Sequence, residues 1–238
     1  MISGNFVCPA GVTKICAEIV GHAADGGTNF FDTGGGGGGG GAYVREDNYV
    51  TVPTVSYPYT IADTAGESST FPTDGNYINA NGPNTWVGGT AGKLSGSPTA
   101  AFNGGNAWFS ANDRAYGRGA GGGARAEGPG GANTGHEQTA GLNADSIGGG
   151  GDGGNFDAPG IDGTGPGAGG GGAGGLSGGV PSGNPPGLGQ PGGLRIFDNS
   201  DGVGYPACAT AERTLLVIGS MPPLPPSPSV RRTASFVV

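Results

Sequence analysis

The sequence of 238 residues offers two imidazoles for acid–base chemistry, His22 and His136. Hydrolases of the Ser-His-Asp or Cys-His type need a nucleophile and an acidic partner next to such a base. Neither histidine has a serine, a cysteine or a group of carboxylates at a spacing typical of these enzymes. Solvent-exposed or hydrogen-bonded structural histidines are the better interpretation, and we expect neither an enzyme nor a cofactor.

Phosphate and metal ions are the other ligands to consider. Segment 119–125 is glycine-rich like a phosphate-binding loop, but it lacks the Gly-Lys-Ser/Thr ending of such loops. Four aspartates occur singly along the chain, without the spacing of a calcium-binding loop. They are Asp145, Asp152, Asp157 and Asp162. Solvated turns explain them better, and no metal site is predicted.

Charge and hydropathy argue against two classes of partner. The chain has 10 Lys and Arg against 18 Asp and Glu, a net charge of −8, whereas phosphate backbones bind to basic surfaces. No run approaches the length of a membrane span, and the first residues do not resemble a secretory signal. We therefore expect no nucleic acid partner and no insertion into a membrane.

The three cysteines are Cys8, Cys16 and Cys208, an odd number without metal-binding spacing. A small disulfide-stabilised protein usually carries four or more, in pairs. We interpret all three as small buried apolar side chains, with a Cys8–Cys16 bridge as the alternative.

The elements that must carry these residues are unusual in composition. Glycine and proline make up 77 of the 238 residues, a proportion that normally indicates disorder. Disordered chains have many charges and few aromatic rings, whereas this chain is 12% charged and has 18 aromatic residues. The composition therefore favours an ordered protein of an uncommon kind.

Apolar alternation predicts β-strands at both ends of the chain. Residues 12–20 alternate like a half-buried strand, and the Pro-Ala-Gly turn at 9–11 suggests a hairpin with the strand before it. Further strands are expected within 42–61 and, as a last buried strand, at 214–218. No segment has a convincing helical period, so the chain is predicted to be all-β.

Residues 66–116 combine turn residues with large rings, a pattern typical of surface loops that are anchored locally. The rings are Phe71, Tyr77, Trp86, Phe102, Trp108, Phe109 and Tyr116. We expect this region to consist of aromatic loops.

Eight consecutive glycines, from Gly34 to Gly41, raise the question of whether residues without side chains can form an element. Extended chains with three residues per turn lack internal hydrogen bonds, but several can bond to one another where glycine faces inward. Five glycines of the later region share one three-residue phase. They are Gly163, Gly169, Gly172, Gly175 and Gly178. We predict a bundle of polyglycine II helices over 117–191, with 34–41 as one helix or as its lining.

Residues 221–238 differ again. The proline-rich stretch 221–228 predicts an extended spacer. The segment after it is basic at Arg231 and Arg232 and apolar around Phe236. We expect an arm that docks on a neighbouring protein by strand addition, with a disordered tail as the alternative.

Several stretches together resemble the glycine-rich domain of phage tail-fibre and other virion surface proteins. They are FVCPAGV at 6–12, the octaglycine followed by AYVRE, VTVPTVSYPYTIADTAG at 50–66, and glycine-rich runs closed by GGLRIF at 192–197. Related domains occur in distal adhesins of T-even-like phages and in anaplastic lymphoma kinase. The resemblance implies a jelly-roll-like β-sandwich with an inserted bundle of packed polyglycine II helices and almost no α-helix. The chain then divides into a sandwich (1–65 and 192–220), aromatic loops (66–116), the bundle (117–191) and the spacer with its arm (221–238).

The resemblance also implies a function at the virion surface. It favours a tail-fibre or fibre-tip adhesin that presents loops to a host glycan or protein and is held by other virion proteins, with a homotrimer as the candidate assembly. Tyr77, Trp86 and Trp108 are the expected contacts, because aromatic rings stack on sugars. The alternative is that these rings only fasten the bundle to the sandwich, and for Trp108 and Phe109 this alternative is the better interpretation. A capsid-decorating or head-fibre protein is the second hypothesis, and an ice-binding polyglycine protein is the third.

Overall fold

The structure is a computed structural model, and the part that it describes leaves several segments out. The described residues are 1–28, 35–73, 76–81, 91–93, 98–107, 120–121, 123–124, 129, 150–153, 158–174, 183–222 and 224–225.

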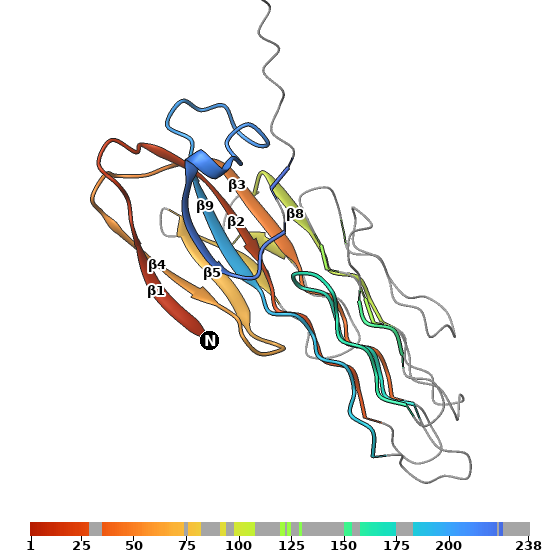
Figure 1. Cartoon of the computed structure of the whole chain (residues 1–238). Helices are drawn as coiled ribbons and strands as arrows, with labels where there is room; N and C mark the ends of the chain where they lie inside the picture. Colours follow the sequence, from red (N-terminus) through yellow and green to blue (C-terminus); the bar gives the residue numbers. More distant parts are fainter. Residues whose placement is uncertain are drawn as a thin grey trace, which may run out of the picture.

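The described strands form two antiparallel sheets of five strands each, which confirms the all-β fold class (Figure 1). The first sheet has the order β1-β4-β5-β6-β7, and the second has the order β10-β9-β2-β3-β8. Their bounds are β1 Ile2–Val7, β2 Lys14–Val20, β3 Tyr43–Val50, β4 Ser56–Ile61, β5 Ser68–Thr73, β6 Asn76–Asn81, β7 Ala91–Lys93, β8 Ala100–Phe102, β9 Gly193–Asp198 and β10 Thr214–Gly219. A three-residue 3₁₀ turn, Ala211–Arg213, precedes β10, and no helix among the described residues could span a membrane.

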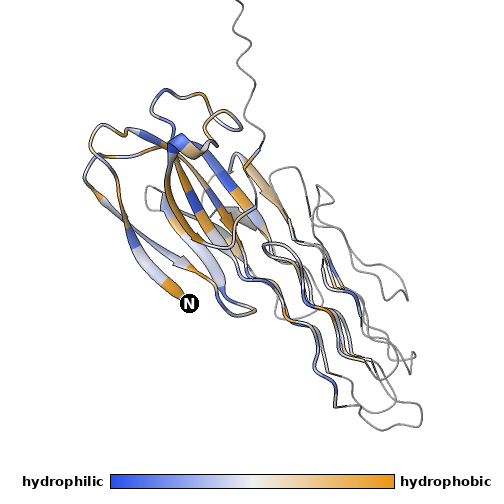
Figure 2. Cartoon of the chain, in the orientation of Figure 1, coloured by the Kyte–Doolittle hydropathy of each residue, from blue (hydrophilic) through white to orange (hydrophobic). Residues whose placement is uncertain are grey.

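The main core lies between the two sheets. Strand β2 alternates as predicted, with Ile15, Ala17 and Ile19 packed in this core. Phe6 and Phe71 reach it from the opposite sheet, with ring centroids 6.3 Å apart. Apolar strands therefore meet in the sandwich, whereas the long glycine-rich segments beside it are nearly neutral in hydropathy (Figure 2).

The predicted hairpin between the first two strands is wrong. A turn does form, with the Val12 amide bonded to the Pro9 carbonyl oxygen, but β1 pairs with β4 and β2 pairs with β3 and β9. The physical reason is that Phe6 and Ile15 face one core from opposite sides. The chain must therefore cross from one sheet to the other at this turn.

Two further expectations about strands need correction. Residues 66–116 are not only loops, because β5, β6, β7 and β8 lie there; Asn-rich and Ser-rich strands such as β6 are held by cross-strand pairing, not by apolar alternation. Residues 214–218 do form a strand, but β10 is an edge strand and is only partly buried.

Candidate functional site

Four strands of the second sheet continue beyond its end as extended glycine-rich runs. Run 21–28 follows β2, run 35–42 leads into β3, run 103–107 follows β8 and run 183–192 leads into β9. Figure 1 shows these runs extending away from the sandwich side by side. The sheet thus determines which runs are neighbours at the base of the bundle.

Backbone hydrogen bonds between the runs repeat every three residues. An antiparallel β-ladder repeats every two residues, whereas packed polyglycine II helices have three residues per turn. The bonds between runs 21–28 and 35–42 are Gly21 N to Ala42 O, Ala24 N to Gly39 O and Gly27 N to Gly36 O. The hydrogen-bond pattern is therefore that of polyglycine II packing, and within the octaglycine the carbonyl oxygens of Gly36, Gly38, Gly39 and Gly41 accept from other runs.

Run 167–174 lies at the centre of the bundle. Its consecutive glycines Gly169, Gly170 and Gly171 each donate one backbone hydrogen bond and accept another. The amides donate to Gly121, Ala24 and Ile161, and the carbonyl oxygens accept from Gly151, Gly38 and Gly187. These partners belong to six different runs. One extended chain surrounded by six others is a hexagonal arrangement.

The six outer runs also bond to one another in a closed ring. Around the ring they are 21–28, 35–42, 120–124 (residue 122 not described), 150–153, 158–163 and 183–192. Bonds that link successive runs are Ala24 N to Gly39 O, Gly121 N to Gly38 O, Ala120 N to Gly151 O, Ile161 N to Asp152 O, Gly160 N to Pro185 O and Gly26 N to Gly187 O. Gly34–Gly41 was expected as one helix or as the lining, and 35–42 is one outer run of this ring.

Side chains are excluded from most inward positions. A Cβ atom added at Gly169 would meet the Gly38 carbonyl oxygen, and one added at Gly172 would meet the Gly35 carbonyl oxygen, each closer than 3.0 Å. Gly169 and Gly172 are three residues apart, and so are Gly35 and Gly38, whose carbonyl oxygens exclude the added Cβ atoms. Gly41 is equally confined, against the Gly21 carbonyl oxygen. Gly34, Gly175 and Gly178, also expected as structural glycines, lie outside the described residues.

Four times along the chain, a run that leads away from the sandwich is followed by one that leads back to it. Run 21–28 is followed by 35–42, 103–107 by 120–124, 150–153 by 158–163, and 167–174 by 183–192. The residues between these runs, Trp108 among them, lie outside the described residues. The end of the bundle away from the sandwich is here called the distal end.

The other expected contact residues are placed only in part. The backbone of Tyr77 is in β6, paired with Pro72 of β5, which puts it on the sandwich and not on the bundle. Trp86 lies outside the described residues, as do Arg231, Arg232 and Phe236.

Comparison with known proteins gives no identification. No protein-family model and no curated protein matches this chain. Its chemistry must therefore be read from its own side chains.

A buried ion pair lies on the face of the second sheet opposite the main core. Arg195 of β9 donates from Nε to Glu18 Oε2 of β2 at 2.8 Å and from Nη1 to the Pro222 carbonyl oxygen at 2.8 Å. Tyr43 Oη donates to Glu18 Oε1 at 2.7 Å, and Glu18 is 1% exposed. Burial, and then the negative charge of Glu18, raise the pKa of Tyr43 well above its ordinary value. The phenol therefore stays protonated as a donor, and the group holds the segment after β10 against the sheet.

The sequence interpretation missed this ion pair. A signal was present, because Glu18 and Arg195 are opposite charges, each with apolar neighbours on both sides in the sequence. What the sequence lacked was their register, which places Glu18 directly across from Arg195.

The interpretation of the cysteines was wrong in part. Cys16 and Cys208 form a disulfide, whereas Cys8 is a free, buried thiol that donates to the Val12 carbonyl oxygen. Cys16 points away from the main core, and the segment around Cys208 folds over that face with Phe197 and Ala209. A partner 192 residues away could not be read from local spacing.

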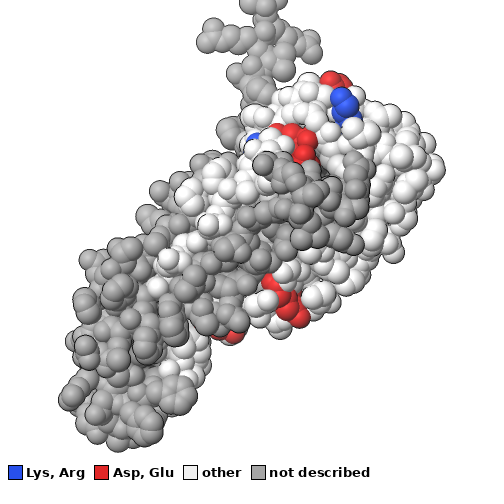
Figure 3. Space-filling view, turned by 180° about the vertical axis from the view of Figure 1, so that it is seen from behind, with Lys and Arg blue, Asp and Glu red and all other residues white. Residues whose placement is uncertain are grey.

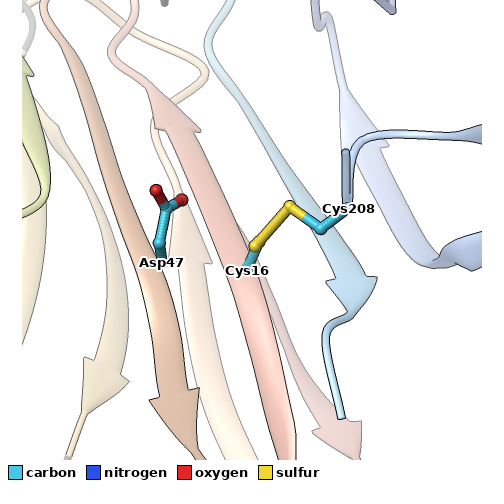
Figure 4. Close-up of side chains that lie close together, drawn as sticks. All are labelled: Cys16, Asp47 and Cys208. Atoms are coloured by element: carbon cyan, nitrogen blue, oxygen red, sulfur yellow. A yellow bond between two sulfur atoms is a disulfide. The ribbon is translucent and has the colours of Figure 1, made fainter. Parts of the chain in front are cut away.

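Asp47 lies beside this disulfide (Figure 4). The potential ligand atoms of Cys16, Asp47 and Cys208 are within 4.8 Å of one another, a grouping that could hold zinc if both thiols were free. Here the two sulfurs are bonded to each other, and Arg45 Nε is 3.0 Å from Asp47 Oδ1. The arrangement is a covalent cross-link next to an ion pair.

Removing the disulfide is expected to destabilise the protein. The double variant Cys16→Ala/Cys208→Ala should lose about 2–4 kcal/mol of unfolding free energy, because the bond closes a very long loop in the unfolded chain. Urea unfolding under oxidising conditions measures this loss. Cys8→Ala is the control, since it removes a buried thiol without a cross-link; an equal loss in both variants would contradict the prediction.

The described residues also hold the histidine that the acid–base analysis considered. His22 is buried, with Nδ1 against the Ala23 carbonyl oxygen at the start of run 21–28. Among the described residues on the face that Figure 3 shows, few are charged, and most of these are acidic. His22 thus has the surroundings of a structural residue, and His136 lies outside the described residues.

Proposed function

We propose that this chain is a non-enzymatic virion surface protein, and that it acts as a tail-fibre or fibre-tip adhesin. One observation carries the proposal: a closed seven-run bundle, with run 103–107 beside it, projects from a β-sandwich and has a distal end remote from that sandwich. A bundle whose backbone groups bond in every lateral direction is a stiff support. Loops on a rigid support are the usual carriers of recognition.

The ligand that suits such a distal end is a host surface glycan or protein. Trp108 comes directly after run 103–107 in the chain, in the stretch that leads to run 120–124, so it is the first candidate for a stacking contact. Tyr77 and Trp86 remain candidates of the same kind, Tyr77 from the sandwich. Other virion proteins hold the sandwich, and the arm carrying Arg231, Arg232 and Phe236 is proposed to take part in that assembly.

Location on the particle tests the proposal directly. Gold-labelled antibody against the chain should mark fibre tips on intact particles. Label spread over the capsid would instead support a capsid-decorating or head-fibre protein.

Binding to host cells is expected to depend on the residues that connect the runs. Trp108→Ala should weaken binding of the purified chain to host cells by about tenfold or more, as loss of a central aromatic contact does. Leu188→Ala is the control, because Leu188 is 57% exposed on the side of the bundle. Thermal melting should be unchanged in both; equal binding by both variants would refute the role of Trp108.

A further inference from the structure

The described sandwich has four sheet edges, and three of them are protected against pairing with another strand. Strands β7 and β8 are only three residues long, and β7 ends in Lys93. Strand β10 has a register shift between Thr214 and Leu216. Short strands, lysines and bulges are the devices by which proteins keep edges from pairing.

Strand β1, Ile2–Val7, has none of these devices. It pairs with β4 over six consecutive residues without a shift, and it is the outermost strand of the first sheet. Its sequence, ISGNFV, has no charge and no proline. Ile2 is 45% exposed and Val7 is 60% exposed. Figure 1 shows β1 at the outer side of the sandwich, away from the bundle. A bare edge of this kind is a site for strand addition.

The two ends of the β1 edge differ in chemistry. At the Ile2 end lie Asp63 and Glu67, whose side chains are 45% and 35% exposed. Both are beside the Met1 amino group, so these three groups carry one negative charge in excess. At the Val7 end, exposed valines gather around the bond from the Cys8 amide to the Val55 carbonyl oxygen. They are Val7 at 60%, Val52 at 58% and Val55 at 42% exposure.

Segment 230–238, which lies outside the described residues, has the complementary order. Arg231 and Arg232 come first, and Phe236, Val237 and Val238 come last. The five steps from Arg231 to Phe236 equal the five steps from Ile2 to Val7. The residues of this segment are mostly of the β-branched, aromatic or small kinds that suit a strand.

We propose that segment 230–238 of a second copy of this chain adds to the β1 edge as a parallel strand. In that direction its arginines meet Asp63 and Glu67, and Phe236 meets the exposed valines. Antiparallel addition would reverse both matches. This inference concerns assembly and does not rest on host binding, so the adhesin proposal can fail while this one stands.

Self-association of the full chain tests the inference, by light scattering over a wide range of concentrations. The wild-type chain should form an oligomer. Val7→Lys, which puts a charge on the edge, and Arg231→Glu/Arg232→Glu, which reverses the arm, should each weaken association at least about tenfold. Val217→Lys is the matched control, because Val217 is 50% exposed on β10, an edge of the other sheet.

Mixing the two defective variants separates this arrangement from others. The Val7→Lys chain keeps its arm and the charge-reversed chain keeps its edge, so the mixture should regain association as pairs of unlike chains. A monomeric wild type, or a mixture that stays monomeric, would overturn the proposal. Loss of association in Val217→Lys but not in Val7→Lys would overturn it as well, in favour of the β10 edge. Thermal melting confirms that each variant is folded.

Discussion

Replacing Gly172 with valine should cost at least about 4 kcal/mol of unfolding free energy, or roughly 8–16 °C in melting temperature for a chain of this size. The new Cβ would lie closer than 3.0 Å to the Gly35 and Gly36 carbonyl oxygens. Those atoms are backbone and cannot rotate away. Run 35–42 would have to move, and the bonds that it makes with runs 21–28 and 167–174 would be strained or lost.

The control for Gly172→Val puts valine elsewhere on the same bundle. Leu188→Val changes a side chain that is 57% exposed on an outer run, and we expect less than about 0.5 kcal/mol. Calorimetric melting of both variants measures the difference. Equal melting temperatures would mean that the runs behave as flexible spacers.

Arg195→Met is expected to cost about 3–5 kcal/mol, because it leaves the Glu18 carboxylate buried without its cation. It also frees the Pro222 carbonyl oxygen that Arg195 holds. Chemical denaturation near neutral pH measures the loss.

The double variant Glu18→Leu/Arg195→Met distinguishes the ion pair from simple packing. Replacing both charges by apolar side chains of similar size is often close to neutral, so most of the lost stability should return. If the double variant is as unstable as Arg195→Met, the stabilising elements are the contact with Pro222 and the hydrogen bond from Tyr43 to Glu18, and not the pairing of charges.

The parts of the fold that repeat locally could be predicted from the sequence. The apolar alternation in 12–20 predicts β2 and the face that it buries. The three-residue spacing of Gly169 and Gly172 predicts that both face inward, and a Cβ atom at either position would meet a carbonyl oxygen of run 35–42. Strand pairing could not be predicted, because the turn at 9–11 looks the same whether the chain stays in one sheet or crosses to the other. Strands β5 and β6 were not predicted for a related reason, because they are held by pairing with each other and lack apolar alternation.

The candidate site was predictable to a smaller extent. The glycine runs predict a bundle, but no local pattern indicates that run 167–174 is central and run 35–42 peripheral. Their positions in the bundle depend on hydrogen bonds between runs that are far apart in the sequence. The Cys16–Cys208 bond and the Glu18–Arg195 pair depend on neighbours 192 and 177 residues apart. Long separations of this kind leave no trace in spacing.

The closed ring of runs has a consequence for how the chain is made. Runs 21–28 and 183–192 are direct neighbours, so the ring cannot close on a ribosome until the last run has emerged. Contacts between residues so far apart also slow folding. During that wait the early runs expose backbone but hardly any apolar surface, and glycine-rich segments are poor seeds for aggregation. A glycine-rich bundle can therefore be completed late in synthesis, because the incomplete chain has a low tendency to aggregate.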